Sequence, residues 1–188
     1  MFEVKLQNLV YIFFFAVLAY LSICFFIWIK QEKFVFYPDR FISATPSHFG
    51  MKYEEFTISV DGESISGWLI PPPFLAEGQN QSNFPLLLCC HGNAGNISDR
   101  IWEAEVIGKM GFSTVLFDYR GYGMSSGKPT ESGIYNDAYA VWKYLVEEKK
   151  ISPQNMIIYG KSLGCAVAVE LATRVRPAGL IIESGFTS

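Results

Sequence analysis

The sequence has no excess of basic residues. Among its 188 residues, 15 Lys and Arg stand against 18 Asp and Glu, which gives a formal net charge of −3. Proteins that bind nucleic acid usually present a positively charged surface, so this balance argues against nucleic acid as a partner. Charged residues make up only 18% of the chain, whereas hydrophobic residues make up 50%. This composition excludes a largely disordered chain and supplies enough apolar side chains for a buried core.

Cysteine is scarce, and its four copies form no framework. Cys24 lies in an apolar run, Cys89 and Cys90 are adjacent in an expected strand and so point to opposite faces of a sheet, and Cys165 stands alone. The spacing fits neither a metal site nor a set of disulfides. We therefore expect small buried thiols, no metal and no cofactor.

One long apolar run extends from Leu9 to Ile29 without a charged residue. As a helix it would be roughly 30 Å long, which matches the hydrocarbon core of a bilayer. A cleaved signal peptide, the first alternative, has a shorter apolar region of about 7–15 residues and a small-residue cleavage site, and Trp28 and Lys30 at the end of this run form no such site. A buried core helix is the second alternative. We expect residues 9–29 to anchor the protein in the lipid bilayer by a single pass.

The charges beside this run give a weak indication of its orientation. Lys30, Lys33 and Arg40 follow the run, whereas Lys5 alone precedes it. Because positive residues favour the cytoplasmic side, the pattern leans toward a cytoplasmic C-terminal domain and leaves the side uncertain.

We expect an anchor over residues 1–30 and one domain over residues 31–188, which is too short for two. Alternating segments joined by a turn at Asp61 and Gly62 predict a hairpin. Beyond it, apolar strands alternate with amphipathic helices, a pattern typical of a parallel sheet covered on both faces. The fold class is therefore α/β with a mixed, mostly parallel sheet. The expected strands are Tyr53–Ser59, Ser64–Ile70, Leu86–Cys90, Ser113–Phe117, Met156–Tyr159 and Gly179–Ile182, and the expected helices lie near Ser98–Met110, Glu131–Lys149 and Leu163–Val175.

The segment Gly160-Lys161-Ser162-Leu163-Gly164 lies between an expected strand and an expected helix. A serine at such a sharp turn can be held in a strained conformation that exposes its hydroxyl, and the two glycines are needed because larger side chains would crowd the turn. We interpret Ser162 as a nucleophile. The helix that follows directs its first N–H groups toward the serine, so the N–H of Leu163 is a candidate donor to an oxyanion.

Two further loops follow parallel strands, where open α/β sheets place their sites. Residues 91–96 form the glycine-rich segment His-Gly-Asn-Ala-Gly-Asn. The N–H of Asn93, or that of Ala94, is the expected second oxyanion donor. Residues 118–125 are interpreted as a loop that shapes the pocket, and Asp118 occupies a turn-forming position rather than that of a catalytic acid.

The sequence partly matches two nucleotide-binding motifs, and each match lacks a required glycine. Gly160, Lys161 and Ser162 resemble the end of a phosphate-binding loop, but Asn155 stands where the first glycine of that motif belongs. In the segment after Asp118, Ser126 replaces the third glycine of a dinucleotide fingerprint. These departures argue against a nucleotide cofactor.

Taken together, these segments resemble the α/β-hydrolase superfamily, and within it the Bem46-like group of single-span, membrane-anchored serine hydrolases. The resemblance also includes Phe36-Tyr37-Pro38 after the span and the ending Glu183–Ser188. It implies an eight-stranded hydrolase fold with a Ser-Asp-His triad that acts on an ester, thioester or amide, the substrate being an acyl compound or another small molecule. Cys165 departs from the pattern, which often has a glycine there, although a small residue should still let the helix pack against the sheet.

The family pattern places an acid and then a histidine after the nucleophile. After Ser162 the sequence contains Glu170 and Glu183 but no histidine. Of the two histidines, His48 is interpreted as a surface residue and His91 as a brace of its own loop. The triad acid and base are therefore not assigned to any residue of this chain.

Three explanations of this ending compete. We expect a fragment of a longer serine hydrolase, because Ser162 and both oxyanion segments look intact, and we expect little turnover from residues 1–188 alone. The alternatives are a shortened product without catalysis and a membrane-tethered binding protein that is not an enzyme. In residues 1–188 alone, the strand Gly179–Ile182 is expected to lie at a sheet edge.

Overall fold

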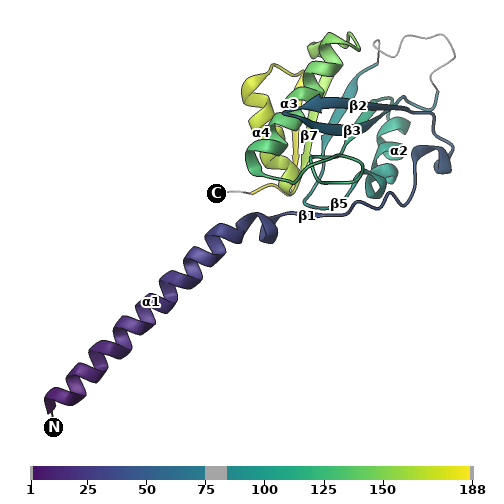
Figure 1. Ribbon diagram of the computed structural model, residues 1–188. Coiled ribbons are helices and arrows are strands. Elements are labelled where there is room, and N and C mark those ends of the chain that lie inside the picture. The colour runs from purple at the N-terminus through teal and green to yellow at the C-terminus, as the bar shows by residue number, and fades with distance from the viewer. Residues whose placement is uncertain (1, 75–83, 187–188) are drawn as a thin grey trace. The chain divides into compact units, whose positions relative to one another are not determined.

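The computed structural model describes residues 2–74 and 84–186 (Figure 1). The polar loop expected through Asn83 lies largely outside this described part. The chain divides into two compact units, Met1–Val35 and Phe36–Ser188, and each is described here by itself.

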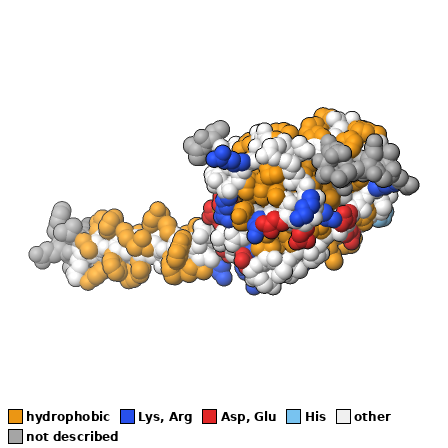
Figure 2. Space-filling model, turned by 90° about the horizontal axis from the view of Figure 1, so that it is seen from above, with side chains coloured by type: hydrophobic (Ala, Val, Ile, Leu, Met, Phe, Trp, Pro, Cys, Tyr) orange, Lys and Arg blue, Asp and Glu red, His pale blue; other side chains and the backbone are white. Residues whose placement is uncertain are grey.

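The first unit is a single helix, α1 (Phe2–Val35). Within it, Gln7–Val35 is long and apolar enough to cross a membrane, with a mean hydropathy of 2.6 and none of that window buried. Figure 2 shows hydrophobic side chains along the length of this helix. Its length and apolar composition fit the expected membrane span. The helix continues six residues beyond Ile29, because Lys30 to Val35 contain no glycine or proline to end it.

The second unit is built on a six-stranded sheet in the order β2-β3-β6-β4-β7-β8. The pairs β2–β3 and β3–β6 are antiparallel, whereas the pairs β6–β4, β4–β7 and β7–β8 are parallel. The expected mixed, mostly parallel sheet is therefore confirmed. The strands are β2 (Glu54–Val60), β3 (Glu63–Ile70), β4 (Leu86–Cys90), β6 (Ser113–Phe117), β7 (Met156–Lys161) and β8 (Gly179–Glu183).

The predicted hairpin joins β2 to β3 by a two-residue turn, with Val60 opposite Glu63. Asp61 and Gly62 both have positive φ, 52° and 84°. A tight hairpin turn of this kind requires positive φ at both central residues, which Asp tolerates and Gly adopts without strain. The local sequence thus sets the register of the two strands.

Helices cover both faces of the sheet. They are α2 (Ile101–Lys109), α3 (Glu131–Glu147) and α4 (Leu163–Arg174), and a 3₁₀ turn over Ile97–Arg100 precedes α2. Leu88 and Cys90 of β4 belong to the apolar cluster that α3 and α4 share, whereas Leu87 and Cys89 belong to the cluster under α2. The predicted opposition of Cys89 and Cys90 is confirmed, because successive residues of a strand point to opposite faces.

A small two-stranded parallel sheet was not predicted. It pairs β1 (Tyr37–Pro38) with β5 (Ala94–Gly95). The backbone N–H of Tyr37 donates to the carbonyl of Asn93 at 3.1 Å, and the N–H of Asp39 donates to that of Gly95 at 3.2 Å. The chain that follows the first unit therefore fixes the glycine-rich loop of residues 91–96. Two-residue strands carry no alternating pattern from which they could be predicted.

Strand β8 lies at one edge of the six-stranded sheet in the described part of the chain. Its Leu180, Ile181 and Ile182 are 41–46% exposed, although their neighbour β7 is largely covered. Parallel strands are usually buried on both faces. The predicted edge position of this segment is therefore observed, with apolar side chains open on each face.

Candidate active site

Ser162 occupies the turn between β7 and α4, with φ 53° and ψ −118°. A non-glycine residue in this region of backbone space is strained and is found mainly where the surrounding structure enforces it. Here the Ser162 N–H donates to the carbonyl of Glu183 at 2.9 Å, and the Ser162 carbonyl accepts from the N–H of Cys165 at 3.0 Å. The Ser162 side chain is exposed. The structure therefore shows the strained backbone and the exposed side chain that we expected for this serine.

The glycines on either side of Ser162 are required by close packing. A Cβ on Gly160 would lie 2.5 Å from the carbonyl oxygen of Gly164, and a Cβ on Gly164 would lie 1.9 Å from that of Cys90. Both distances are far below van der Waals contact. The structure therefore supplies the steric reason that the sequence analysis assumed for both positions.

Cys165 occupies a position near the Ser162 turn where the family pattern often has glycine. Its side chain is buried, and its thiol lies 3.1 Å from the carbonyl of Gly160 and 3.2 Å from that of Glu183. The small side chain fits between α4 and the ends of β7 and β8, as expected from its size.

The loop of residues 91–96 lies beside Ser162. A Cβ on Gly92 would stand 3.8 Å from the Ser162 Cβ, an ordinary contact distance. Leu163 is the first residue of α4, so its N–H has no partner within the helix. Asn93 is the next residue of the loop after Gly92. The oxyanion donors predicted from the sequence, Leu163 and Asn93, thus belong to segments that meet at the serine.

The loop of residues 118–125 supports the glycine-rich loop from beneath. The hydroxyl of Tyr119 donates to the carbonyl of His91 at 3.0 Å, and the hydroxyl of Tyr122 donates to the carbonyl of Asn93 at 2.8 Å. Both tyrosines are fully buried. From the sequence we expected only that this loop shapes the pocket. The structure shows that it also fixes the carbonyl groups on either side of Gly92.

His91 and Asp118 form a buried pair behind this loop. His91 Nδ1 lies 2.7 Å from the carbonyl of Gly92, and His91 Nε2 lies 3.8 Å from Asp118 Oδ1. Burial lowers the pKa of His91 to about 4, so its ring is neutral at pH 7 and Nδ1–H donates to Gly92. Burial raises the pKa of Asp118 to about 7, although the N–H groups of Ile97 and Met124 oppose this. His91 therefore braces its own loop, as predicted.

We expect these two pKa shifts to have opposite effects on stability. Between about pH 4 and 7 the folded protein holds a proton on Asp118 that the unfolded chain has released, so this contribution falls as pH rises. His91 acts in the opposite direction up to about pH 6.5, because the unfolded chain holds the extra proton. In the Asp118→Asn variant only the His91 contribution remains.

The free energy of unfolding of Asp118→Asn, relative to that of the parent chain, should therefore rise by about 2 kcal/mol between pH 4.5 and 6.5. Chemical unfolding of the full chain in detergent micelles, followed by circular dichroism at each pH, measures this difference. A difference that does not change with pH would show that the pKa of Asp118 is not raised in the folded protein.

The other titratable residues considered from the sequence lie away from the Ser162 hydroxyl or are paired. His48 is exposed in the turn Pro46–Phe49, and its Nδ1 lies 2.9 Å from the hydroxyl of Thr45. Glu170 is paired with Arg174 at 2.5 Å. The interpretation of His48 as a surface residue is confirmed.

An ion-pair cluster beside the nucleophile was missed by sequence reasoning. Lys161 Nζ lies 2.8 Å from Glu103 Oε1 and 3.2 Å from Glu183 Oε1, so it joins α2 and β8 to the residue before Ser162. The hydroxyl of Tyr159 donates to the second oxygen of Glu183 at 2.5 Å, and these partners lower the pKa of Glu183. The sequence feature that could have indicated this cluster is a lysine at the end of an otherwise apolar strand.

Within residues 2–74 and 84–186, no group of three or more His, Cys, Asp and Glu side chains is arranged to hold a metal ion. A family model described as the alpha/beta hydrolase fold matches residues 85–178, which run from the start of β4 to the end of α4 and its following turn. The chain belongs to the α/β-hydrolase family. That match includes Ser162, the glycine-rich loop and the tyrosines that brace it.

Relatives place this α/β hydrolase in the Bem46-like group. It is 35% identical to the uncharacterized protein Rv2307c of Mycobacterium tuberculosis, over 89% of this chain and 58% of the relative. It is 32% identical to protein bem46 of Schizosaccharomyces pombe, over 85% of this chain and 55% of the relative. The lysophosphatidylserine lipase ABHD12 of Danio rerio is 38% identical over 57% of this chain and 30% of its own length.

Solved structures show the same hydrolase fold. The esterase Pf2001 of Pyrococcus furiosus matches with a TM-score of 0.64 and 23% identity, over 79% of this chain and 58% of the esterase. Because the sequence identity between the two proteins is low, the similarity shows a shared fold and nothing more. The α/β-hydrolase chain described here spans a little over half the length of Rv2307c and bem46.

Proposed function

We propose that this α/β hydrolase carries the nucleophile and the oxyanion hole of a membrane-anchored serine hydrolase. Ser162 is the nucleophile, and the N–H groups of Leu163 and Asn93 are the oxyanion donors. The observation that carries the proposal is the backbone of Ser162, held at φ 53° by hydrogen bonds on both sides. Such strain is characteristic of functional turns, and here it exposes a hydroxyl beside the glycine-rich loop.

The reaction we propose is acyl transfer to Ser162. The Ser162 oxygen attacks a carbonyl carbon, its proton passes to a general base, and the carbonyl oxygen becomes an oxyanion beside α4. The positive end of the helix dipole favours negative charge there. The base then passes that proton to the leaving alcohol, thiol or amine as its bond to the acyl carbon breaks, and water hydrolyses the acyl ester on Ser162, which releases the acid and restores the hydroxyl. The substrate class is an ester, thioester or amide.

A lipid-derived acyl compound is the substrate we favour within this class. One relative is named as a lysophosphatidylserine lipase. The helix Gln7–Val35 would also hold the enzyme at a bilayer, where such substrates lie. The side of the membrane on which the domain lies stays a prediction from the flanking charges.

A second candidate function is a membrane-tethered binding protein without hydrolysis. It is favoured by the position of His91, whose Nδ1 donates to Gly92 and whose Nε2 faces Asp118 rather than Ser162. His48 is exposed and paired with Thr45. Neither histidine is placed to take the Ser162 proton, so we assign the base and the acid to neither of them.

A labelling experiment distinguishes the two candidate functions. An activated phosphonate that reacts with catalytic serines is applied, in membranes, to a longer version of the protein that includes the triad acid and base, and the labelled peptide is identified by mass spectrometry. We expect the label on Ser162, with its loss in Ser162→Ala and its retention in Ser184→Ala. Ser184 is a matched control because it is also exposed and has a positive φ of 55°. Absence of label from that longer version would favour the binding protein.

Membrane anchoring by α1 predicts how the protein fractionates. The full chain should stay in the membrane pellet through an alkaline carbonate wash, because transfer of the apolar residues of Gln7–Val35 into water is strongly unfavourable. A variant that lacks residues 1–35 should appear in the supernatant or in aggregates that sediment without membranes in a flotation gradient. Release of the full chain by carbonate would contradict the anchor.

A further inference from the structure

Three exposed apolar side chains surround one backbone hydrogen bond near the start of the second unit. The N–H of Gly123 donates to the carbonyl of Asp39 at 2.8 Å, which ties the segment after α1 to the loop of the two bracing tyrosines. Tyr37 stands two residues before Asp39, Phe41 stands two residues after it, and Met124 follows Gly123. We call these three side chains, Tyr37, Phe41 and Met124, the apolar patch.

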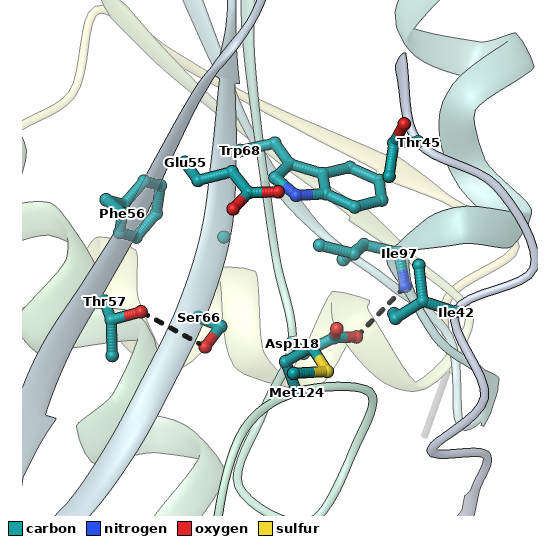
Figure 3. A pocket seen from close by; sticks show the side chains of 11 residues that line it. Ile42, Thr45, Glu55, Phe56, Thr57, Ser66, Trp68, Ile97, Asp118 and Met124 are labelled. Atoms are coloured by element: carbon teal, nitrogen blue, oxygen red, sulfur yellow. Dashed lines mark hydrogen bonds between the residues drawn. The ribbon is translucent and has the colours of Figure 1, made fainter. Parts of the chain in front are cut away.

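Each side chain of the apolar patch is open to solvent. Phe41 is 73% exposed, Met124 is 69% exposed and Tyr37 is 57% exposed. The two segments that carry them also meet at one cavity, because Met124 and Ile42, the residue after Phe41, both line it (Figure 3). Single exposed apolar side chains are common on proteins, whereas three from two adjoining segments form a candidate contact surface.

The backbone of the apolar patch is already fixed by hydrogen bonds. Asn96 Nδ2 donates to the carbonyls of Asp39 and Phe41 at 3.2 and 2.8 Å, and the N–H of Phe41 donates to Asp39 Oδ1 at 2.8 Å. The charged neighbour Arg40 donates to the carbonyl of Gly127 at 3.0 Å. A rigid surface loses less conformational entropy on binding than a flexible one, so this segment is suited to contact a partner.

The sequence puts the apolar patch directly after the expected membrane span. Only Phe36 stands between Val35, where α1 ends, and Tyr37. With residues 9–29 in the hydrocarbon core, residues 30–35 extend the helix by about 9 Å, and the polar headgroup layer is about 5–8 Å thick on each side. The length of the connecting chain therefore keeps Tyr37 near the outer surface of the headgroup layer.

The opposite end of the sheet offers a matched reference residue. The loops of residues 91–96 and 118–125 follow the carboxyl ends of β4 and β6, whereas Met110 precedes the amino end of β6. The five residues of β6 extend over about 17 Å. Met110 is 64% exposed and so is almost as open as Met124. The two methionines therefore differ mainly in which end of the sheet they occupy.

We propose that the apolar patch docks on the lipid headgroup layer of the bilayer that residues 9–29 span. Aromatic side chains favour the boundary between membrane and water, and the patch begins two residues after α1. Tyr37 and Phe41 supply the rings, and Met124 adds a flexible apolar chain. Docking brings the glycine-rich loop, which pairs with Tyr37, close to the lipid. The inference rests on the membrane anchor proposed above and does not depend on Ser162.

Quenching of a fluorescent label measures this contact on the full chain in phosphatidylcholine vesicles. Cys24 is replaced by Ala, and the other three cysteines are buried, so bimane reacts with an introduced cysteine. The variants carry Met124→Cys or Met110→Cys, and the quencher is a phosphatidylcholine with a nitroxide on its headgroup. We expect at least about threefold more quenching at residue 124 than at residue 110, since the ends of β6 lie about 17 Å apart.

A flexible linker separates docking from mere tethering. Inserting about twelve Gly and Ser residues between Val35 and Phe36 lets the second unit move roughly 20 Å from the end of the span. We expect the quenching at residue 124 to persist, because the apolar patch itself holds the surface to lipid. In this linker variant Phe41→Ser should lower that quenching by at least about twofold through loss of a buried ring. Phe49→Ser removes a ring that is 54% exposed and outside the patch, and should leave it unchanged.

Three results would overturn the docking. They are equal quenching at residues 124 and 110, loss of the quenching at residue 124 when the linker is inserted, and equal losses from Phe41→Ser and Phe49→Ser. Flotation of each sample with the vesicles tests the anchor separately, and a chain that does not float would overturn the anchor and the docking together. Absence of phosphonate label from Ser162 in the longer version would contradict the hydrolase proposal alone, since the quenching needs no catalysis.

Discussion

Replacing Ser162 by Ala is expected to lower kcat for an activated acyl ester by about 10⁶-fold in a chain that has a complete triad. The chain described here spans 58% of Rv2307c. We propose a chimera that adds the part of Rv2307c that follows the counterpart of Ser188, because the family pattern places the acid and the histidine after the nucleophile. The loss is large because the Ser162 oxygen forms the bond to the acyl carbon.

The chain of residues 1–188 provides the comparison in this kinetic experiment. We expect it to show at most the residual acceleration, about 10³–10⁴-fold over water, that an oxyanion hole and binding supply without a triad. The chimera with Ser184→Ala serves as the matched control and should keep its rate. A chimera with Ser162→Ala that hydrolyses the ester at the parent rate would contradict Ser162 as nucleophile.

Adding one methyl group at Gly164 is expected to cost about 3 kcal/mol or more in the free energy of unfolding. The new Cβ would lie 1.9 Å from the carbonyl oxygen of Cys90 and 2.7 Å from that of His91. Both are backbone atoms, which cannot turn aside as a flexible side chain can. α4 would have to move away from β4, and the first turn of α4 would separate from the glycine-rich loop.

The matched control for this substitution is Gly179→Ala on β8. A Cβ there would meet side-chain atoms of Ile157 at 3.8 Å, an ordinary contact distance, and we expect a change within about 0.5 kcal/mol. Chemical unfolding of the full-length variants in detergent micelles measures both changes. Equal losses from Gly164→Ala and Gly179→Ala would show that the turn has no special steric demand.

Much of the fold could be predicted from local sequence patterns. The strands β4 and β6 begin and end at the expected residues, because continuous apolar runs fill them and turn-forming residues bound them. The hairpin turn at Asp61 and Gly62 could be predicted because its positive φ values are local demands. The Ser162 turn was predictable for the same reason, since two glycines mark a steric requirement within five residues.

What the sequence could not show are contacts between distant segments. The strands β1 and β5 pair Tyr37 with Ala94 through backbone hydrogen bonds. Every residue except proline has a backbone N–H donor, so the side chains give no sign of this pairing. The complete burial of Asp118 was also not predicted, because its turn-forming position says nothing of the distant segments that cover it. The partners of Lys161 come from α2 and β8, and no local pattern relates these elements.

The central claim is that an acyl group passes through the Ser162 oxygen. The most direct measurement traps the acyl-enzyme during turnover of a slowly hydrolysed 4-nitrophenyl ester by the chimera, quenches it in acid and locates the adduct by peptide mass spectrometry. We predict an acyl group on Ser162 that appears with the nitrophenol burst and is absent from Ser162→Ala. An adduct on another residue, with the burst intact in Ser162→Ala, would contradict the account.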